Sequence, residues 1–264
     1  MKFSCCIEMI YTEYDFVERI YKAKEDGFEY VEFWNWDDKD IPMIKKALDD
    51  TGMKLAAFQG NSKGRMVDAE DAEIYFDGVL KGLEVAKELG AVNMFLMSDI
   101  MQEDRSVKPM DRPCSDEEKE AASISMLKRI ATLAEAAGVM AVIEPLNTIV
   151  DHRGYSLCHT KPGVELLKKV NSPNVKLLYD AYHMQIMEGN IIDTIKKYHE
   201  YFGHFHIADV PGRFEPGTGE LNYRNILTAL AESGYDRLVG FEFEPKRAPD
   251  SQVMRSVLKE FGDI

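Results

Sequence analysis

Three acidic residues and one histidine interrupt otherwise apolar runs of the sequence, each near the carboxyl end of its run. Glu144 ends VMAVIE, Asp180 ends NVKLLYD, His206 lies in HFHIAD and Glu242 lies in VGFEFE. A buried carboxylate is costly unless it is paired with a cation or bound to a metal ion. If these four side chains converge, they predict a site for one divalent cation.

The spacing of the four residues supports a shared site. Successive members are separated by 36, 26 and 36 residues, which is close to whole strand–helix units. Taken singly, each acid could cap a helix or form half of a salt bridge, and His206 could be a core histidine. The regular spacing favours convergence. A mixed set of oxygen and nitrogen ligands suits Mg²⁺, Mn²⁺ or Co²⁺ more than a closed zinc site.

The elements that would carry these residues are short apolar runs alternating with longer amphipathic segments, which is typical of repeated βα units. The 264 residues divide into about 33 residues for each of eight such units, and no linker interrupts them. We therefore expect a single-domain (β/α)₈ TIM barrel over residues 1–264. The expected strands are FSCCIEM (3–9), YVEFW (30–34), KLAAF (54–58), AVNMFLM (91–97), VMAVIE (139–144), NVKLLYD (174–180), GHFHIAD (203–209) and RLVGFEFE (237–244).

The longest connections follow the third, fourth and fifth expected strands, and in a barrel such loops lie on the carboxyl face, where active sites form. We expect them to cover a substrate. His204, two residues before His206, should lie one layer below the metal. The residues expected to line a pocket, with packing as the alternative, are Trp34, Asn35, Trp36, Phe58, Gln59 and Asn61.

Composition limits the partners. The formal net charge is −14 and no basic cluster interleaved with aromatic residues occurs, which argues against nucleic acid. The four cysteines lack CxxC spacing, so we expect reduced packing residues. No apolar run reaches the length of a membrane span, and we expect a cytoplasmic protein without membrane contact. Tyr75 and Phe76 could lie at a contact in a homo-oligomer or face the core.

Four segments carry specific sequence: IEPLN (143–147), YDAYHMQIMEGN (179–190), HIADVPGRFEPGTGELNY (206–223) and GFEFEP (240–245). With these segments the chain resembles the hydroxypyruvate isomerase family within the xylose isomerase-like TIM barrels, whose relatives include ketose 3-epimerases. The resemblance implies that Glu144, Asp180, His206 and Glu242 bind the metal. It also implies that His183 and Arg213 contact the substrate, although His183 could instead cap a loop, and Arg213 could pair with Glu215 or Glu220.

Two departures bear on the substrate. Hydroxypyruvate isomerases often have Gln at the position of His206. A histidine at this position is typical of the epimerases. The stretch beyond IEPLN reads TIV, where epimerases are expected to have an acidic substrate contact. The chain thus combines isomerase-like loops with one epimerase-like ligand.

The expected reaction is an aldose–ketose isomerisation through an enediolate, with Glu144 and Glu242 as the acid/base pair. The substrate would be a small keto acid or sugar, for example hydroxypyruvate converted to tartronate semialdehyde. A ketose 3-epimerase and a sugar lyase or dehydratase remain alternatives, because both begin with the same proton removal. A metal-dependent endonuclease would need more histidines than the six present, and a protein that only binds sugar would not need two bases.

Overall fold

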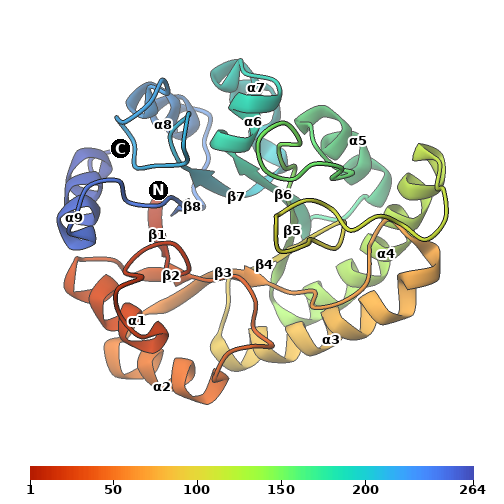
Figure 1. Cartoon of the computed structure of the whole chain (residues 1–264), viewed down its shortest axis with the longest axis horizontal. Helices are drawn as coiled ribbons and strands as arrows, with labels where there is room; N and C mark the ends of the chain where they lie inside the picture. The colour runs from red at the N-terminus through yellow and green to blue at the C-terminus, as the bar shows by residue number, and fades with distance from the viewer.

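The computed structural model describes all residues, 1–264, and forms a closed ring of eight parallel strands in sequence order (Figure 1). The predicted barrel and its eight runs are confirmed. Six strands end one to three residues before the predicted end, and among these are the strands that lead to Glu144 and Glu242, so both residues directly follow their strands. The strands are β1 (Lys2–Cys6), β2 (Tyr30–Glu32), β3 (Lys54–Gln59), β4 (Asn93–Leu96), β5 (Met140–Ile143), β6 (Val175–Asp180), β7 (Phe202–Ile207) and β8 (Leu238–Phe241).

Helices surround this ring (Figure 1). A helix follows every strand, and β6 is followed by a pair. A loop separates each strand from its helix except after β6, where the first helix of the pair begins at the next residue. No helix is both long and apolar enough to cross a membrane. The helices are α1 (Phe16–Glu25), α2 (Ile41–Thr51), α3 (Ala72–Leu89), α4 (Asp116–Ala137), α5 (Thr160–Val170), α6 (Ala181–Met187), α7 (Ile191–Tyr198), α8 (Tyr223–Glu232) and α9 (Asp250–Phe261), with short 3₁₀ turns at Ala69–Asp71 and His199–Tyr201.

Local sequence determines where the longest helix begins and ends. The Ser115 side chain accepts a hydrogen bond from the Glu118 backbone N–H, and the Glu118 carboxylate accepts one from Ser115, which forms a capping box at the start of α4. Gly138 ends the helix with φ of 67°, a left-handed conformation that glycine adopts without a steric penalty. The chain then enters β5, which leads to Glu144.

The hydrophobic core lies between the strands and the helices. Tyr75 on α3 belongs to it, since its side chain is fully buried and its hydroxyl donates to the Met97 carbonyl at 2.9 Å. Tyr75 therefore faces the core and is not available for a contact with a second subunit. Phe76 is only partly buried, and the Arg129 guanidinium lies 3.8 Å from its ring centre. The four cysteines are unpaired, and two of them, Cys5 and Cys6, are buried.

Helix α3 approaches the site end of β3 closely because of Gly82. A Cβ at this position would lie 2.2 Å from the Gly60 carbonyl oxygen, just beyond β3. We therefore expect Gly82→Ala to lower the free energy of unfolding by about 1–3 kcal/mol, because the helix must move outward. Urea unfolding would measure this change. Glu84→Ala, an exposed change on the same helix, is the control and should alter stability by less than about 0.5 kcal/mol.

Candidate active site

The four residues predicted to converge lie together at the carboxyl end of the barrel. Glu144 directly follows β5, Asp180 is the last residue of β6, His206 lies in β7 and Glu242 directly follows β8. Each offers one ligand atom, and these atoms all lie within 4.8 Å of one another. All four side chains are buried. The parallel strands bring them together because the carboxyl ends of adjacent strands share one face of the barrel.

Glu242 has the most contacts in this cluster. Its Oε2 lies 3.2 Å from His206 Nδ1 and accepts a 2.5 Å hydrogen bond from Arg213 Nη2. Its Oε1 accepts a 2.7 Å bond from the indole N–H of Trp34. Arg213 Nη2 also lies 3.7 Å from Asp180 Oδ2. The carboxylate of Glu242 is therefore held by three groups from other parts of the chain.

These contacts move the pKa values of the two glutamates in opposite directions. Burial, together with the charge of Glu242, raises the pKa of Glu144 well above its usual range. Burial also acts to raise the pKa of Glu242, but His206 and Arg213 outweigh it and hold that pKa well below its usual range. Burial raises the pKa of Asp180 to about 6. The cluster therefore has an unequal carboxyl pair, a feature of acid/base sites.

The donor set fits a divalent cation. Several buried ligand atoms have no hydrogen-bond partner: Oε1 of Glu144, Oδ2 of Asp180 and both ring nitrogens of His206. Such atoms are rare in protein interiors because losing water without gaining a partner is costly. Three carboxylates and one imidazole around one point would satisfy Mg²⁺, Mn²⁺ or Co²⁺.

His183 is oriented by the IEPLN segment. Its Nδ1 lies 3.2 Å from the backbone nitrogen of Asn147 and 2.8 Å from Asn147 Nδ2. Because a backbone N–H can only donate, Nδ1 is the acceptor and the hydrogen is on Nε2. That atom lies 3.6 Å from Asp180 Oδ2 and has no hydrogen-bond partner. Burial, followed by the charge of Arg213, lowers the pKa of His183 well below its usual range, so the ring is neutral.

Arg213 reaches the cluster because one carboxylate organises the loop after β7. Asp209 Oδ2 accepts hydrogen bonds from the backbone nitrogens of Gly217, Thr218 and Gly219, at 2.8, 3.1 and 2.9 Å. Asp209 Oδ1 accepts hydrogen bonds from the backbone nitrogens of Val210 and Leu221. The backbone nitrogen of Arg213 donates to the Asp209 carbonyl oxygen. Arg213 therefore turns inward to Glu242 and Asp180, not to Glu215 or Glu220. The sequence-based reasoning did not identify Asp209.

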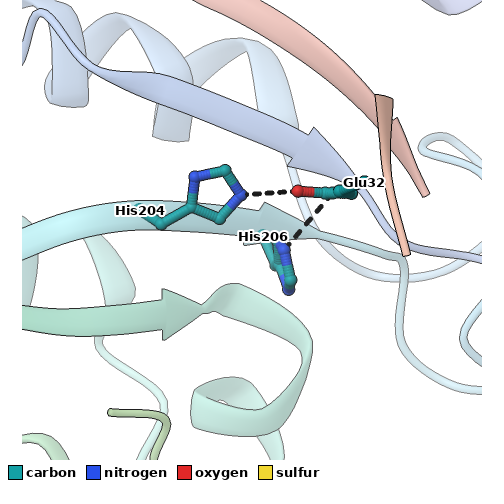
Figure 2. A group of neighbouring side chains, drawn as sticks. All are labelled: Glu32, His204 and His206. Carbon is teal, nitrogen blue, oxygen red and sulfur yellow. Dashed lines mark hydrogen bonds and ion pairs between the residues drawn. The ribbon is translucent and has the colours of Figure 1, made fainter. Parts of the chain in front are cut away.

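A polar layer lies directly below the four-residue cluster. His204 is fully buried there, as expected, and its Nε2 lies 2.8 Å from Oε2 of Glu32, the last residue of β2 (Figure 2). Burial acts to raise the pKa of Glu32, but His206 and His204 outweigh it and lower the pKa to about 2. The sequence-based reasoning missed Glu32, although YVEFW carries the same signal as the other strands, an acid within an apolar run.

The cluster opens into a cavity of about 470 Å³. Glu144, His183, Arg213 and Glu242 all line it, and so do four residues predicted to form the pocket: Trp34, Asn35, Gln59 and Asn61. Trp36 and Phe58 are not among the lining residues, and Phe58 is fully buried in the core. A second cavity of about 300 Å³ lies beside α4 and α5 and contains none of the candidate residues.

The role of Asp209 can be tested by Asp209→Asn. An amide has only one acceptor oxygen, so its NH₂ group must face backbone N–H donors on one side. We expect the free energy of unfolding to fall by about 1–3 kcal/mol. Glu220→Gln, an exposed change in the same loop, should leave it almost unchanged. Urea unfolding of the two variants would provide the comparison, and equal stabilities would contradict the anchoring role.

The family model of the xylose isomerase-like TIM barrel matches residues 20–260. A hydroxypyruvate isomerase of Escherichia coli K12 is 31% identical over 258 residues, covering 95% of this chain and 96% of that protein. A 2-oxo-tetronate isomerase of Cupriavidus necator is 31% identical over 256 residues, covering 93% of each chain.

Among solved structures, one titled AP endonuclease, family 2, from Brucella melitensis has a TM-score of 0.87 and 29% sequence identity, covering 99% of this chain and 98% of that one. The two relatives named from sequence are both isomerases, which places this chain among isomerase enzymes. From the family match and this full-length similarity, together with the closed barrel, the chain belongs to the xylose isomerase-like TIM barrel family.

Proposed function

We propose that this chain is a metal-dependent isomerase of a small 2-keto acid, with hydroxypyruvate as the leading substrate. The observation that carries the proposal is that Glu144 and Glu242 line the same cavity as His183 and Arg213. Two carboxylates, a neutral imidazole and a guanidinium around one small cavity suit the movement of a proton between neighbouring carbons. The names of the relatives from E. coli and C. necator agree with this reaction class.

Glu144, Asp180, His206 and Glu242 would hold the divalent cation. When bound, such an ion supplies a Lewis acid that stabilises negative charge developing on neighbouring substrate oxygens. In the proposed reaction, one glutamate removes a proton from C3 of hydroxypyruvate and the other delivers a proton to C2. A hydroxyl proton passes from the C3 oxygen to the C2 oxygen, so that the product is tartronate semialdehyde.

The other two residues would bind and orient the substrate. His183 carries its hydrogen on Nε2, the nitrogen that lacks a hydrogen-bond partner, and can donate it to a substrate oxygen. Arg213 is held against Glu242 and Asp180, so its charge lies beside the reacting end. The Arg213 guanidinium lies over the Tyr182 ring, with 5.3 Å between the guanidinium carbon and the ring centre, and this contact limits the movement of the Arg213 side chain.

Three cationic side chains on the cavity wall would bind an acid group better than a neutral sugar. Lys63 and Arg105 line the cavity in addition to Arg213. A carboxylate at the far end of a keto acid would meet these cations, whereas a neutral ketose would gain little from them. Epimerisation of a ketose and elimination from a modified sugar begin with the same proton removal, so product analysis has to separate them.

Proton exchange with solvent tests the reaction. We expect the Mn²⁺- or Mg²⁺-loaded protein to incorporate deuterium from D₂O into hydroxypyruvate and to form tartronate semialdehyde, as followed by NMR. Glu144→Gln and Glu242→Gln should each lower the rate by about 10²–10⁴-fold, since each removes one proton-transfer group. Removal of the metal with a chelator should abolish exchange.

Glu103→Gln is the matched control, because Glu103 is exposed in a loop near the cavity mouth and outside the cluster. Its exchange rate should equal that of the unmodified chain. Exchange into ketoses but not into keto acids would favour the epimerase. Release of water or another leaving group would favour the lyase, and an absence of exchange with every substrate would contradict the proposal.

Recognition of the acid group predicts a selective effect of Lys63→Met. The KM for hydroxypyruvate should rise by roughly 2–5-fold, the size expected when one exposed charge pair is lost, while kcat changes little. Lys87→Met, an exposed change at the end of α3, should leave both parameters unchanged. Steady-state kinetics of the two variants would decide, and an unchanged KM in Lys63→Met would remove Lys63 from acid recognition.

A further inference from the structure

The polar layer below the candidate metal ligands forms a directional chain of hydrogen bonds. Asn93 Nδ2 lies 3.2 Å from Nδ1 of His204, and His204 Nε2 lies 2.8 Å from Glu32 Oε2. Because the amide nitrogen donates, Nδ1 of His204 is the acceptor and its hydrogen is on Nε2. His204 therefore donates to Glu32, whose other oxygen is free for a second donor.

That second oxygen faces His206. Glu32 Oε1 lies 3.4 Å from His206 Nε2, and neither atom has a hydrogen-bond partner elsewhere in the chain, so each is the nearest group that could satisfy the other. Figure 2 shows both histidine rings, from the same strand, beside this one carboxylate. On the opposite side of the ring, His206 Nδ1 lies 3.2 Å from Glu242 Oε2 and 3.9 Å from Glu144 Oε1. The two nitrogens of His206 thus face different partners.

The contact between Glu32 and His206 requires the absence of a side chain at position 240. Gly240 pairs with His206 across β7 and β8. A Cβ on Gly240 would lie 2.1 Å from Glu32 Oε1 and 2.7 Å from His206 Cδ2. Any larger residue would push the carboxylate away from the ring, so the contact between Glu32 and His206 depends on a glycine in the neighbouring strand.

We propose that Glu32 is a positioning residue that holds His206 in the tautomer with hydrogen on Nε2, so that the Nδ1 lone pair points at the cation site. This inference rests on the metal site of the proposed function. A hydrogen bond to the far nitrogen of a ligating histidine fixes its tautomer and its ring orientation. Glu32 itself contacts neither the cavity nor the substrate; it acts through His206.

The chemistry of the position requires a carboxylate. Two Nε2–H groups, from His204 and His206, need two acceptors on one side chain, and an ionised carboxylate offers two acceptors and no donor. A glutamine of the same shape offers one acceptor and one NH₂ group. Its NH₂ must face one of the two histidines, and if it faces His206 the ring hydrogen moves to Nδ1, where it blocks the cation.

A second metal ion is the competing explanation, since Glu32, His204 and His206 could together offer ligands to one. The 2.8 Å contact between His204 and Glu32 has the length of a hydrogen bond, and because His204 Nδ1 accepts from Asn93, the nitrogen that faces Glu32 carries the hydrogen and has no lone pair for a metal. We therefore favour the hydrogen-bond chain. The metal stoichiometry separates the two, because the hydrogen-bond chain requires one ion per chain.

The experiment is Mn²⁺ binding to the whole protein, followed by electron paramagnetic resonance. The unmodified chain should bind one Mn²⁺, and Glu32→Gln should bind it roughly 10–100-fold more weakly, as is typical when such a partner of a ligating histidine is lost. Ser4→Ala is the matched control. Ser4 is buried and donates to Glu32 Oε2 at 3.4 Å, so its loss leaves the acceptors of Glu32 in place and affinity unchanged.

A double variant tests the direction of the hydrogen bonds. In Glu32→Gln with Asn93→Asp, the new carboxylate at position 93 accepts from His204 Nδ1–H, and His204 Nε2 accepts from the new amide at position 32. The amide oxygen then remains for His206 Nε2–H. We expect the double variant to recover most of the Mn²⁺ affinity. A residue needed only for packing would give no such recovery.

Nitrogen-15 NMR of the Mg²⁺-loaded, unmodified chain gives a test that does not depend on variants. It should show the hydrogen of His206 on Nε2. A hydrogen on Nδ1, two metal ions per chain, unchanged affinity in Glu32→Gln or no recovery in the double variant would each overturn the role of Glu32. If the unmodified chain binds no Mn²⁺, the metal site of the proposed function fails as well, which distinguishes the two failures.

Discussion

The cost of burying several carboxylates at the centre of one barrel is the constraint on which the site depends. Glu32, Glu144, Asp180 and Glu242 are each no more than 6% exposed. Isolated charges in such an environment are unfavourable by several kcal/mol or more, so each must have a cation or a donor. Arg213, His206 and the indole of Trp34 supply part of this compensation. The unpartnered ligand atoms on Glu144, Asp180 and His206 are the part that a divalent cation would complete.

The fold meets this constraint by dividing the tasks between strands and loops. The four candidate ligands lie at or directly after the carboxyl ends of strands β5 to β8, which are paired in one closed sheet. The groups that would meet the substrate lie in helix α6, which carries His183, and in the loop after β7, which carries Arg213; hydrogen bonds that involve the backbone hold each in place. Asn147 orients His183, and Asp209 gathers the loop that turns Arg213 inward. Rigid ligands with individually anchored substrate contacts are the arrangement expected where geometry controls rate.

The polar layer below the site consists of residues that lie outside the cavity but are linked to the candidate ligand His206. Asn93, His204 and Glu32 do not line the cavity, yet Asn93 contacts His204, His204 contacts Glu32 and Glu32 contacts His206. Buried polar groups without a partner are unfavourable, so a chain of this kind is stable only if every donor meets an acceptor. The same requirement sets the direction of donation, which runs from Asn93 through His204 to Glu32 and, in the proposed tautomer, from His206 to the same carboxylate.

The sequence by itself determined the eight βα units and the four candidate ligands, because apolar periodicity and acids at strand ends are local signals. It also indicated His183 and Arg213 through a resemblance. Only the tertiary structure decided their contacts: that Arg213 pairs with Glu242, that Asp209 anchors its loop, and that Tyr75 belongs to the core. Glu32 is separated from His206 by more than half of the chain, and the two meet inside the barrel near Gly240. Contacts between residues so far apart in the sequence depend on closure of the barrel and on the direction of each side chain, which no local pattern of residues specifies.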